Sequence, residues 1–362
     1  MRIPLLKPNP PKIFEFSKYL GLSYDASTFS NGGPCAQLLE ERLKIYIGLP
    51  ETPILMTNAT SALTVALQAL GLGGGAEILV PSFTFSATGH SIINARCTPV
   101  LVDIGRDLVI DLVDAERKIT NATKALIVVQ PLGFTCGDYK KYETFANAYG
   151  LRLIFDSAAV LGATYGDGTR AGGAGDCEVF SLHITKTFGI GEGGLLTSRN
   201  PDVLKTARRI ANFGFDERGY SVLVGSNAKC SDFHAAVGLA TLEVIDEKLS
   251  IKKRIASHYD ALFSDRIETV SKNRPSGQQV YPILLQTQEI RDKMAWRLKE
   301  HGIGSRIYYV PLHRQPYFFD KTGLFPVTDD ITDRILCIPF FETISASDRV
   351  EVTQLILDGA TG

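Results

Sequence analysis

Short apolar runs recur along the chain up to about residue 198, and turn residues separate them from one another. The runs are continuous and rich in Val, Ile and Leu, which is typical of strands buried on both faces of a sheet. We therefore predict seven strands, at residues 53–57, 77–80, 99–103, 125–130, 151–156, 178–182 and 194–198.

Helical patterns lie between several of these strands. In residues 60–72, Leu63, Leu67 and Leu70 fall on one face of a helix. Residues 138–149 and 201–212 are two further helical candidates. Strands that alternate with helices in this way favour an α/β fold with a mostly parallel sheet covered by helices.

The regular alternation of predicted strands and helices ends at about residue 230. Residues 231–264 predict one or two long helices, with Ser231 or Asp232 as the N-cap. A smaller α/β unit follows, with strands at 280–285, 306–309 and 336–339 and helices at 290–300 and about 346–357. We predict an N-terminal arm and a large domain over 1–245, and a small C-terminal domain over 246–362. The proline-rich first dozen residues are expected to form an irregular arm.

Composition and charge narrow the classes of protein. Of 362 residues, 44% are hydrophobic and 21% charged, which is the balance of an ordinary globular protein. A net charge of −1 gives no basic excess for nucleic acid or an anionic membrane. The start lacks the apolar core of a signal peptide, and no stretch approaches the ~18 apolar residues of a membrane span. The six scattered cysteines contain no CxxC pair, so we expect reduced thiols, no metal site and a cytoplasmic protein.

Two ionisable residues lie at the ends of predicted strands. Lys186 follows one strand, and the ordinary interpretation of a lysine is a solvated surface charge. In a cleft, however, burial lowers the pKa of an amine and makes it nucleophilic. Asp156 ends another strand and, taken alone, suggests a helix cap or a turn. Together the two match pyridoxal phosphate (PLP), which needs a lysine for its Schiff base and an anion beside its pyridine nitrogen.

Three further segments carry candidate chemistry. Ala59 and Thr60 open a predicted helix, where backbone N–H groups form either a phosphate cradle or an ordinary cap. Phe85 follows a strand and either stacks on a flat ring or packs in the core. A dinucleotide-like glycine spacing occurs at Gly189, Gly191 and Gly194. A strand follows it where that fingerprint requires a helix, which disfavours a dinucleotide site.

Taken in order, four segments resemble the DegT/DnrJ/EryC/StrS family of sugar aminotransferases. They are PSFTFSAT (81–88), FDSAAVLGATYGDG (155–168), FSLHITKTFGIGEGG (180–194) and SNAKCSDFHAAVGL (226–239). The resemblance extends from Asn31 to Pro339 and implies the aspartate aminotransferase fold, called fold type I, in a homodimer. The SLHxTK and NAKxSxFHAA forms are similar to the branch that aminates dTDP-linked 4-keto-6-deoxyhexoses.

The resemblance also implies roles for individual residues that bind PLP. Lys186 would form the internal aldimine, and Asp156 would pair with the pyridine nitrogen. Phe85 would stack on the ring. The phosphate would be held by Ala59, Thr60, Ser181 and, from the partner subunit, Asn227.

Other positions concern the substrate and the cofactor's surroundings. His313 matches a histidine near the sugar-nucleotide pocket, although a structural histidine with satisfied hydrogen bonds explains it equally well. His183, in the segment that leads to the lysine, is a second candidate for substrate contact. The family usually has Gln or His where this chain has Ala159, so the contact with the cofactor's 3-oxygen must come from water or another group.

The resemblance implies transfer of an amino group from L-glutamate to a nucleotide-linked keto sugar, in the synthesis of deoxyamino sugars for polysaccharides such as the O-antigen. Amination at C3 in place of C4, other PLP chemistry and a non-enzymatic regulatory role remain alternatives. The dehydratase branch of the family replaces the lysine with histidine, and Lys186 argues against that branch.

Overall fold

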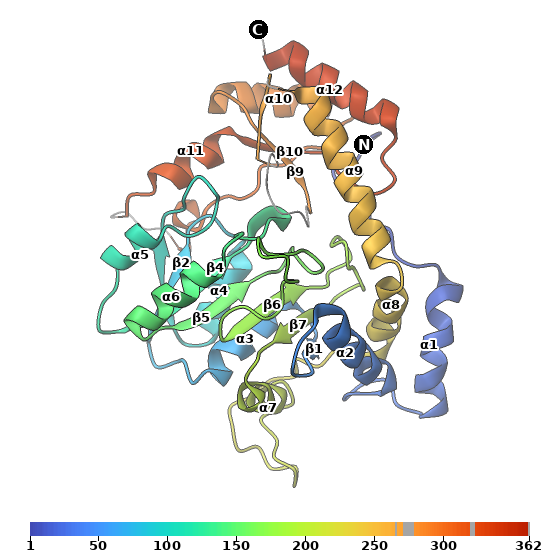
Figure 1. The fold of residues 1–362 in the computed structure, drawn as a ribbon, viewed down its shortest axis with the longest axis vertical. Coiled ribbons are helices and arrows are strands. Elements are labelled where there is room, and N and C mark those ends of the chain that lie inside the picture. The colour runs from blue at the N-terminus through green and yellow to red at the C-terminus, as the bar shows by residue number, and fades with distance from the viewer. Residues whose placement is uncertain (265, 271–278, 319–322, 361–362) are drawn as a thin grey trace.

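A seven-stranded sheet forms the centre of the computed structural model, which describes residues 1–264, 266–270, 279–318 and 323–360 (Figure 1). The strand order is β1-β7-β6-β5-β4-β2-β3, and β7 runs antiparallel to both of its neighbours while the other pairs are parallel. The strands are β1 (Ile54–Met56), β2 (Glu77–Pro81), β3 (Thr98–Val102), β4 (Thr123–Val129), β5 (Arg152–Asp156), β6 (Cys177–Ser181) and β7 (Gly194–Thr197). All seven predicted strands and the mostly parallel sheet are confirmed.

The strands of the sheet are mostly apolar because both of its faces are covered. In β4, Leu126 and Val128 pack into one apolar cluster with helices α2 (Pro34–Ile47) and α8 (Asp232–Leu242). The residue between them, Ile127, packs into a second cluster on the opposite face. Successive side chains of a strand point to opposite faces, so a strand covered on both sides needs a continuous apolar run.

The three predicted helices of this region are confirmed as α3 (Ala59–Ala69), α6 (Lys140–Tyr149) and α7 (Pro201–Ile210). The structure adds α1 (Ile13–Asp25), α2, α4 (Ser86–Asn94), α5 (Leu112–Arg117) and a 3₁₀ turn at Pro131–Gly133. Helix α4 has a weak apolar pattern because Thr88, Gly89 and Ser91 occupy its buried face. Small polar residues on a buried face hide a helix from a search for apolar periodicity.

The remaining elements assemble around a second, three-stranded antiparallel sheet with the order β10-β9-β8. They are α9 (Ile245–Phe263), β8 (Glu268–Thr269), β9 (Tyr281–Leu284), α10 (Gln288–Glu300), α11 (Pro326–Arg334), β10 (Ile335–Ile338) and α12 (Ala346–Ala360). Helix α8 and a 3₁₀ turn (Leu312–Arg314) pack instead against the large sheet. Ser231 caps α8, as predicted, by accepting the His234 N–H. Figure 1 shows α9 rising from the level of the large sheet to α10 and α12. We keep the domain boundary near residue 245 as a proposal.

The strand predicted at 306–309 is wrong. Only Arg306 pairs with a strand, through reciprocal backbone bonds to Cys337 of β10. The segment then leaves the small sheet, and the Tyr309 ring lies 5.4 Å from Phe83 and 6.4 Å from Phe85, at the edge of the large sheet. Aromatic packing between the two sheets replaces the strand pairing that the local sequence suggested.

The first dozen residues form the irregular arm that the prolines predicted. Ile3 forms an isolated bridge with Ile303, and the Leu5 carbonyl accepts the Phe340 N–H. The arm is thereby attached to the C-terminal part of the chain before α1 begins. None of the helices in the described residues is both long and apolar enough to cross a membrane.

Candidate active site

Asp156 and Lys186 come together at one edge of the large sheet. Asp156 is the last residue of β5, and Lys186 follows the end of the neighbouring strand β6 by five residues. The two strands are parallel, so their carboxyl ends meet at the edge where open α/β sheets bind ligands. The two charges interact there, as the sequence predicts for a site that pairs them.

Buried hydrogen bonds hold the Asp156 carboxylate in place. The side chain is 5% exposed, Thr88 Oγ1 donates to Oδ2 at 2.7 Å, and the Ala158 N–H donates to Oδ1 at 3.2 Å. Thr84 supports Thr88 through a 2.8 Å bond between the two hydroxyls. Burial raises the pKa of Asp156. The hydrogen bonds from Thr88 and Ala158, together with the positive charge of Lys186, oppose that rise. A carboxylate has about four acceptor sites, so it retains capacity for a protonated ring nitrogen.

A second buried network fixes the turn behind Asp156. The Glu178 carboxylate on β6 accepts Ser157 Oγ at 2.6 Å, Tyr165 OH at 2.8 Å and the Gly172 N–H at 2.6 Å. Burial raises the pKa of Glu178, and these donors oppose the rise. Sequence reasoning missed this network, because its members lie on separate strands and loops.

The Lys186 amine lies in a tight loop after β6. Its pKa is lowered by burial, and the Asp156 carboxylate opposes that change, which makes the amine a stronger nucleophile than a solvated lysine. A side chain at Gly189 would place its Cβ 2.6 Å from the Ile184 carbonyl oxygen. The glycine therefore serves the fold of this loop, which explains a dinucleotide-like spacing without a dinucleotide site.

Gln279 clamps the backbone on both sides of Lys186. Its Oε1 accepts the Thr187 N–H at 3.2 Å, and its Nε2 donates to the Thr185 carbonyl. Gln279 is 5% exposed and lies just before β9, far from the lysine in the sequence. Sequence reasoning missed it, since no local motif surrounds it.

The start of α3 has the features of a phosphate cradle. The Asn58 side chain caps the helix by accepting the Ser61 N–H at 2.8 Å, so the N–H groups of Ala59 and Thr60 are not used by that cap. A Cβ at Gly194 would lie 2.5 Å from the Asn58 carbonyl, so β7 can approach this turn only with glycine there. Capping and a phosphate cradle are therefore compatible at this turn.

Two predicted ring and phosphate contacts line the same edge. Phe85 is 56% exposed, which argues against the core-packing alternative, whereas Phe83 occupies the core. Ser181 ends β6, and its Oγ accepts the His183 N–H at 3.3 Å. Ala159 lies in the turn after Asp156 and has no polar group to offer. The cofactor roles of these residues stay predictions.

The two histidines differ in how their rings are occupied. His313 is buried, with Nδ1 2.6 Å from Ser82 Oγ and Nε2 3.0 Å from Asp329 Oδ1. Both nitrogens are thus engaged, which favours the structural interpretation over substrate contact. His183 is half-exposed, and its Nδ1 lies 2.8 Å from Thr185 Oγ1. Its Nε2 lies 3.6 Å from Glu192, and 41% of its side chain is exposed, so a ligand can reach it from solvent.

Asn227 is exposed and pairs with Asn212 in an isolated bridge. The next residue, Ala228, accepts the Thr57 N–H at 2.8 Å, so this segment runs beside the turn that leads into α3. Its predicted contact with a partner subunit stays a prediction. No cluster of three or more possible metal ligands occurs within the described parts of the chain.

The donor set fits PLP. A buried carboxylate, a buried amine and a helix N-terminus lie around one edge of the sheet, where the cofactor offers a ring nitrogen, an aldehyde carbon and a phosphate. The carboxylate suits a protonated ring nitrogen, and the lowered pKa of the amine suits its attack on the aldehyde carbon.

Known proteins share this sequence and fold. The sequence model of the DegT/DnrJ/EryC1/StrS aminotransferase family matches residues 14–356. The dTDP-4-amino-4,6-dideoxy-D-glucose transaminase of Shigella dysenteriae is 33% identical over 95% of each chain. The UDP-2-acetamido-2-deoxy-3-oxo-D-glucuronate aminotransferase of Pseudomonas aeruginosa is 31% identical over 85% of this chain and 86% of that protein.

Solved structures agree with this family match. The crystal structure of DesI in the presence of its TDP-sugar product superposes with a TM-score of 0.92 at 31% identity, covering 99% of this chain and 93% of that one. The pyridoxamine-phosphate form of Spr1654 from Streptococcus pneumoniae has a TM-score of 0.89 at 26% identity, covering 98% and 97%.

Proposed function

The chain belongs to the DegT/DnrJ/EryC1/StrS family of PLP-dependent sugar aminotransferases, and from this premise we propose that it moves the amino group of L-glutamate to the keto carbon of a dTDP-linked 4-keto-6-deoxyhexose. The observation that carries the proposal is the buried pair of Lys186 and Asp156 at the edge of the large sheet. The Shigella relative acts on a dTDP-linked 4-amino sugar, which supports this nucleotide and this carbon.

Each residue of the site has a definite task in this reaction. Bound PLP supplies an electron-withdrawing ring that makes the donor's Cα–H acidic. Asp156 holds a proton on the ring nitrogen, because a buried carboxylate stabilises the positive charge there. The Lys186 amine takes the proton from Cα of the donor and, in the second half of the reaction, delivers a proton to the former keto carbon of the sugar.

Amination at C3 is the second candidate. The Pseudomonas relative carries a 3-oxo sugar in its name, and its identity to this chain is close to that of the Shigella enzyme. The residues that select C3 or C4 contact the sugar, and His183 is the half-exposed candidate among them.

The experiment incubates the cofactor-loaded enzyme with L-glutamate and a panel of dTDP-, UDP- and GDP-linked keto sugars, and NMR locates the new amine. We expect a 4-amino product from the dTDP-4-keto sugar. A 3-amino product would establish the second candidate, and no product with any sugar would overturn the proposal. The Lys186→Ala variant is the control and should lose about 10³-fold or more in rate.

We also propose a homodimer in which Asn227 of one subunit reaches the phosphate site of the other. The segment from Phe213 to Val224, defined here as the apolar hairpin, projects below α7 in Figure 1. It exposes Phe213 (44%), Tyr220 (64%) and Val224 (73%) directly before Asn227. A cluster of exposed apolar side chains of this kind is typical of a protein interface.

Mixing variants tests the shared site. Asn227→Ala and Lys186→Ala are each expected to have little activity, but re-formed heterodimers place both intact residues in one of the two sites. Activity should therefore recover on mixing to about a quarter of the wild-type value, since half of the dimers are mixed and half of their sites are intact. No recovery, with dimers verified by sedimentation, would contradict a site built by two chains.

A further inference from the structure

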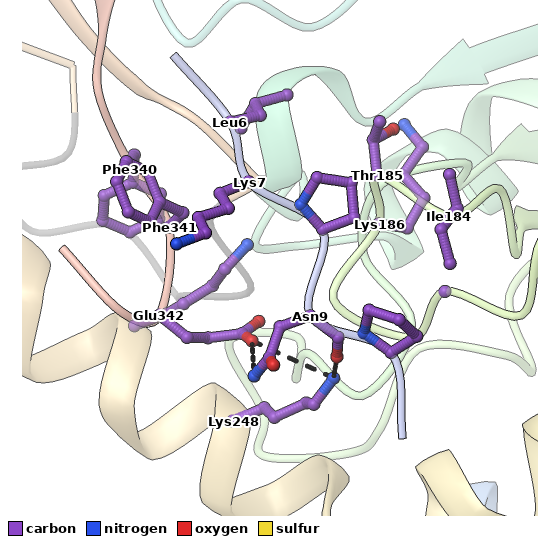
Figure 2. Close-up of a pocket in the computed structure, with 14 residues that line it drawn as sticks. Leu6, Lys7, Asn9, Ile184, Thr185, Lys186, Lys248, Phe340, Phe341 and Glu342 are labelled. Atoms are coloured by element: carbon purple, nitrogen blue, oxygen red, sulfur yellow. Dashed lines mark hydrogen bonds and ion pairs between the residues drawn. The ribbon is translucent and has the colours of Figure 1, made fainter. Parts of the chain in front are cut away.

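A small cavity lies beside Lys186, and Asp156 is not among the residues that line it. Its walls come from the arm, the lysine loop, α9 and the segment after β10, and Figure 2 shows the arm passing between Lys186 and Glu342. The cavity has a volume of about 10 Å³, which is room for one water-sized group. We define this space, between Lys186 and the residues Lys248, Lys252 and Glu342, as the lysine cavity.

Two charged residues of the lysine cavity are already engaged. Lys248 Nζ donates to the Asn9 carbonyl at 2.6 Å and lies 3.9 Å from Glu342. The Asn9 side chain donates to the same Glu342 carboxylate at 2.8 Å. Figure 2 shows these three residues joined in one group, which fastens the arm to α9 and to the segment after β10.

Lys252, one turn further along α9, differs from Lys248. It is 5% exposed, and its ammonium group lies 5.4 Å from the centre of the Phe340 ring. Among the described residues no hydrogen-bond acceptor is found for it. Its Nζ is not among the fully enclosed polar atoms that lack a partner, so it opens to the lysine cavity, where a water molecule or an anion can join it.

The balance of charge around the lysine cavity favours an anion. Lys7, Lys186, Lys248 and Lys252 line it, against the single carboxylate of Glu342. Burial lowers the pKa of Lys252 to about 8, and the charges of Lys248 and Lys186 lower it further while Glu342 opposes them. At neutral pH the group therefore still carries a proton that a bound anion can use.

We propose that the lysine cavity is a carboxylate subsite, in which Lys252 binds one carboxylate group of the dicarboxylic amino donor. The proposal rests on the proposed function insofar as that function names L-glutamate as the donor. Lys186 also lines the cavity, and its charge acts on Lys252, so a carboxylate bound to Lys252 lies near the lysine that handles the amino group. Room for one water-sized group suits a single carboxylate oxygen and is too small for a phosphoryl group.

Binding of glutarate, a dicarboxylate without an amino group, tests the subsite directly. Isothermal titration calorimetry compares the cofactor-loaded wild type with Lys252→Met, Lys252→Arg and Lys253→Met. Lys253 is the matched control, because it is the exposed neighbour on the same helix. We expect Lys252→Met to weaken glutarate binding about 10- to 100-fold, the worth of a charged hydrogen bond, and the other two variants to bind within a few-fold of wild type.

A variant that does not fold is replaced by a measurement on the wild type. Glutarate affinity should fall as the pH rises through about 8, because Lys252 must be protonated to bind it. Equal glutarate affinity in folded Lys252→Met and wild type, or an affinity that does not change between pH 7 and 9.5, would overturn the subsite.

Single-turnover release of 2-oxoglutarate from L-glutamate, without any sugar, extends the test to the donor. Lys252→Met should raise the concentration of L-glutamate needed for half-maximal rate by the same factor as for glutarate. With L-alanine as donor, an equal loss assigns the α-carboxylate to Lys252, and no loss assigns the distal one. A change confined to the maximal rate would mean that Lys252 acts only on Lys186 and would overturn the subsite.

The outcomes separate this inference from the proposed function. Lys252-dependent binding of glutarate by an enzyme that aminates no keto sugar would leave the subsite standing and remove the proposed sugar chemistry. Amination of the keto sugar by an enzyme whose glutarate affinity is the same with and without Lys252 would leave the proposed function standing and remove the subsite.

Discussion

Asp156 and Lys252 are two buried ions of opposite charge near the same lysine, and their surroundings differ completely. Each is 5% exposed. Asp156 receives hydrogen bonds from Thr88 and from the Ala158 N–H, whereas no acceptor for Lys252 is found among the described residues. The Asp156 carboxylate therefore has hydrogen-bond partners within the protein, whereas the Lys252 ammonium gains an acceptor only when a ligand binds.

This difference matches how long the cofactor and the amino donor each stay bound. A cofactor that stays through every turnover benefits from a carboxylate fixed in advance, because no reorganisation is then needed during the reaction. A donor that enters and leaves needs a group whose charge is satisfied only while the donor is bound. An unpaired Lys252 favours entry, and the exit of the product restores the unpaired state.

The largest expected effect is on the Asp156 side. Asp156→Asn keeps the shape of the side chain but removes the negative charge that faces the ring nitrogen. We expect PLP to dissociate about 10- to 100-fold more readily, and the rate to fall by more than this factor, because the neutral amide no longer holds the ring proton. Equilibrium dialysis against free PLP measures the first effect and initial rates the second.

The control for this variant is Asp202→Asn, an exposed residue at the start of α7, which should leave both quantities unchanged. Wild-type retention of PLP by Asp156→Asn would show that the carboxylate is not fixed for the cofactor. The contrast between the two sides of Lys186 would then lose its basis.

An intermediate effect is expected from Gln279, which touches neither buried ion but holds the backbone of Lys186. Gln279→Leu removes both clamp bonds at similar volume and leaves the Thr187 N–H and the Thr185 carbonyl without partners. We expect a loss of about 1–3 kcal/mol in the free energy of unfolding and about a tenfold drop in kcat. Denaturant unfolding and steady-state kinetics measure the two.

Gln279→Glu sharpens that test, because it keeps the acceptor for Thr187 but places a carboxylate oxygen against the Thr185 carbonyl. A buried, unpaired charge is costly, so this variant should lose at least as much as Gln279→Leu in both measurements. Wild-type kcat in Gln279→Leu would show that the lysine loop holds its shape without help from the C-terminal part of the chain.

The effect on the Lys252 side concerns stability alone, with no change in the maximal rate, and has a defined sign. The pKa of Lys252 is about 8 in the folded protein and about 10.4 in the unfolded chain, so between these values the unfolded state binds more protons. The free energy of unfolding therefore rises with pH in this window, by about 3 kcal/mol at most. The difference between wild type and Lys252→Met, measured by denaturant unfolding from pH 7.5 to 10.5, should show this rise. A flat difference would mean that an acceptor already partners Lys252.

The features that could be predicted from the sequence are those that depend on residues close together along the chain. The seven strands were visible because each is a short apolar run covered on both faces, and Asp156 and Lys186 were visible because each stands at a strand end. The role of His313 does not follow from the sequence, since both possible roles use the same residue, and its contacts with Ser82 and Asp329 favour the structural one.

The parts that were missed depend on distant segments. Thr88 lies on a helix without apolar periodicity, Gln279 comes from the region before β9, and Lys252 faces residues from both ends of the chain. The incorrect strand at 306–309 has the same origin, because Tyr309 packs against Phe83 across the molecule. Apolar periodicity reports which face of an element is buried, but not which segment covers it.

The fastening of the arm has a consequence for the order in which the molecule is completed. Asn9 leaves the ribosome well before its partners Lys248 and Glu342, which are translated more than two hundred residues later. The large sheet can collapse while synthesis continues, because its strands end at Thr197. The arm must wait until Glu342 has emerged, so the wall of the lysine cavity forms after the large sheet. A chain that stops short of Glu342 can build the Asp156 side of the site but not the side that receives the donor.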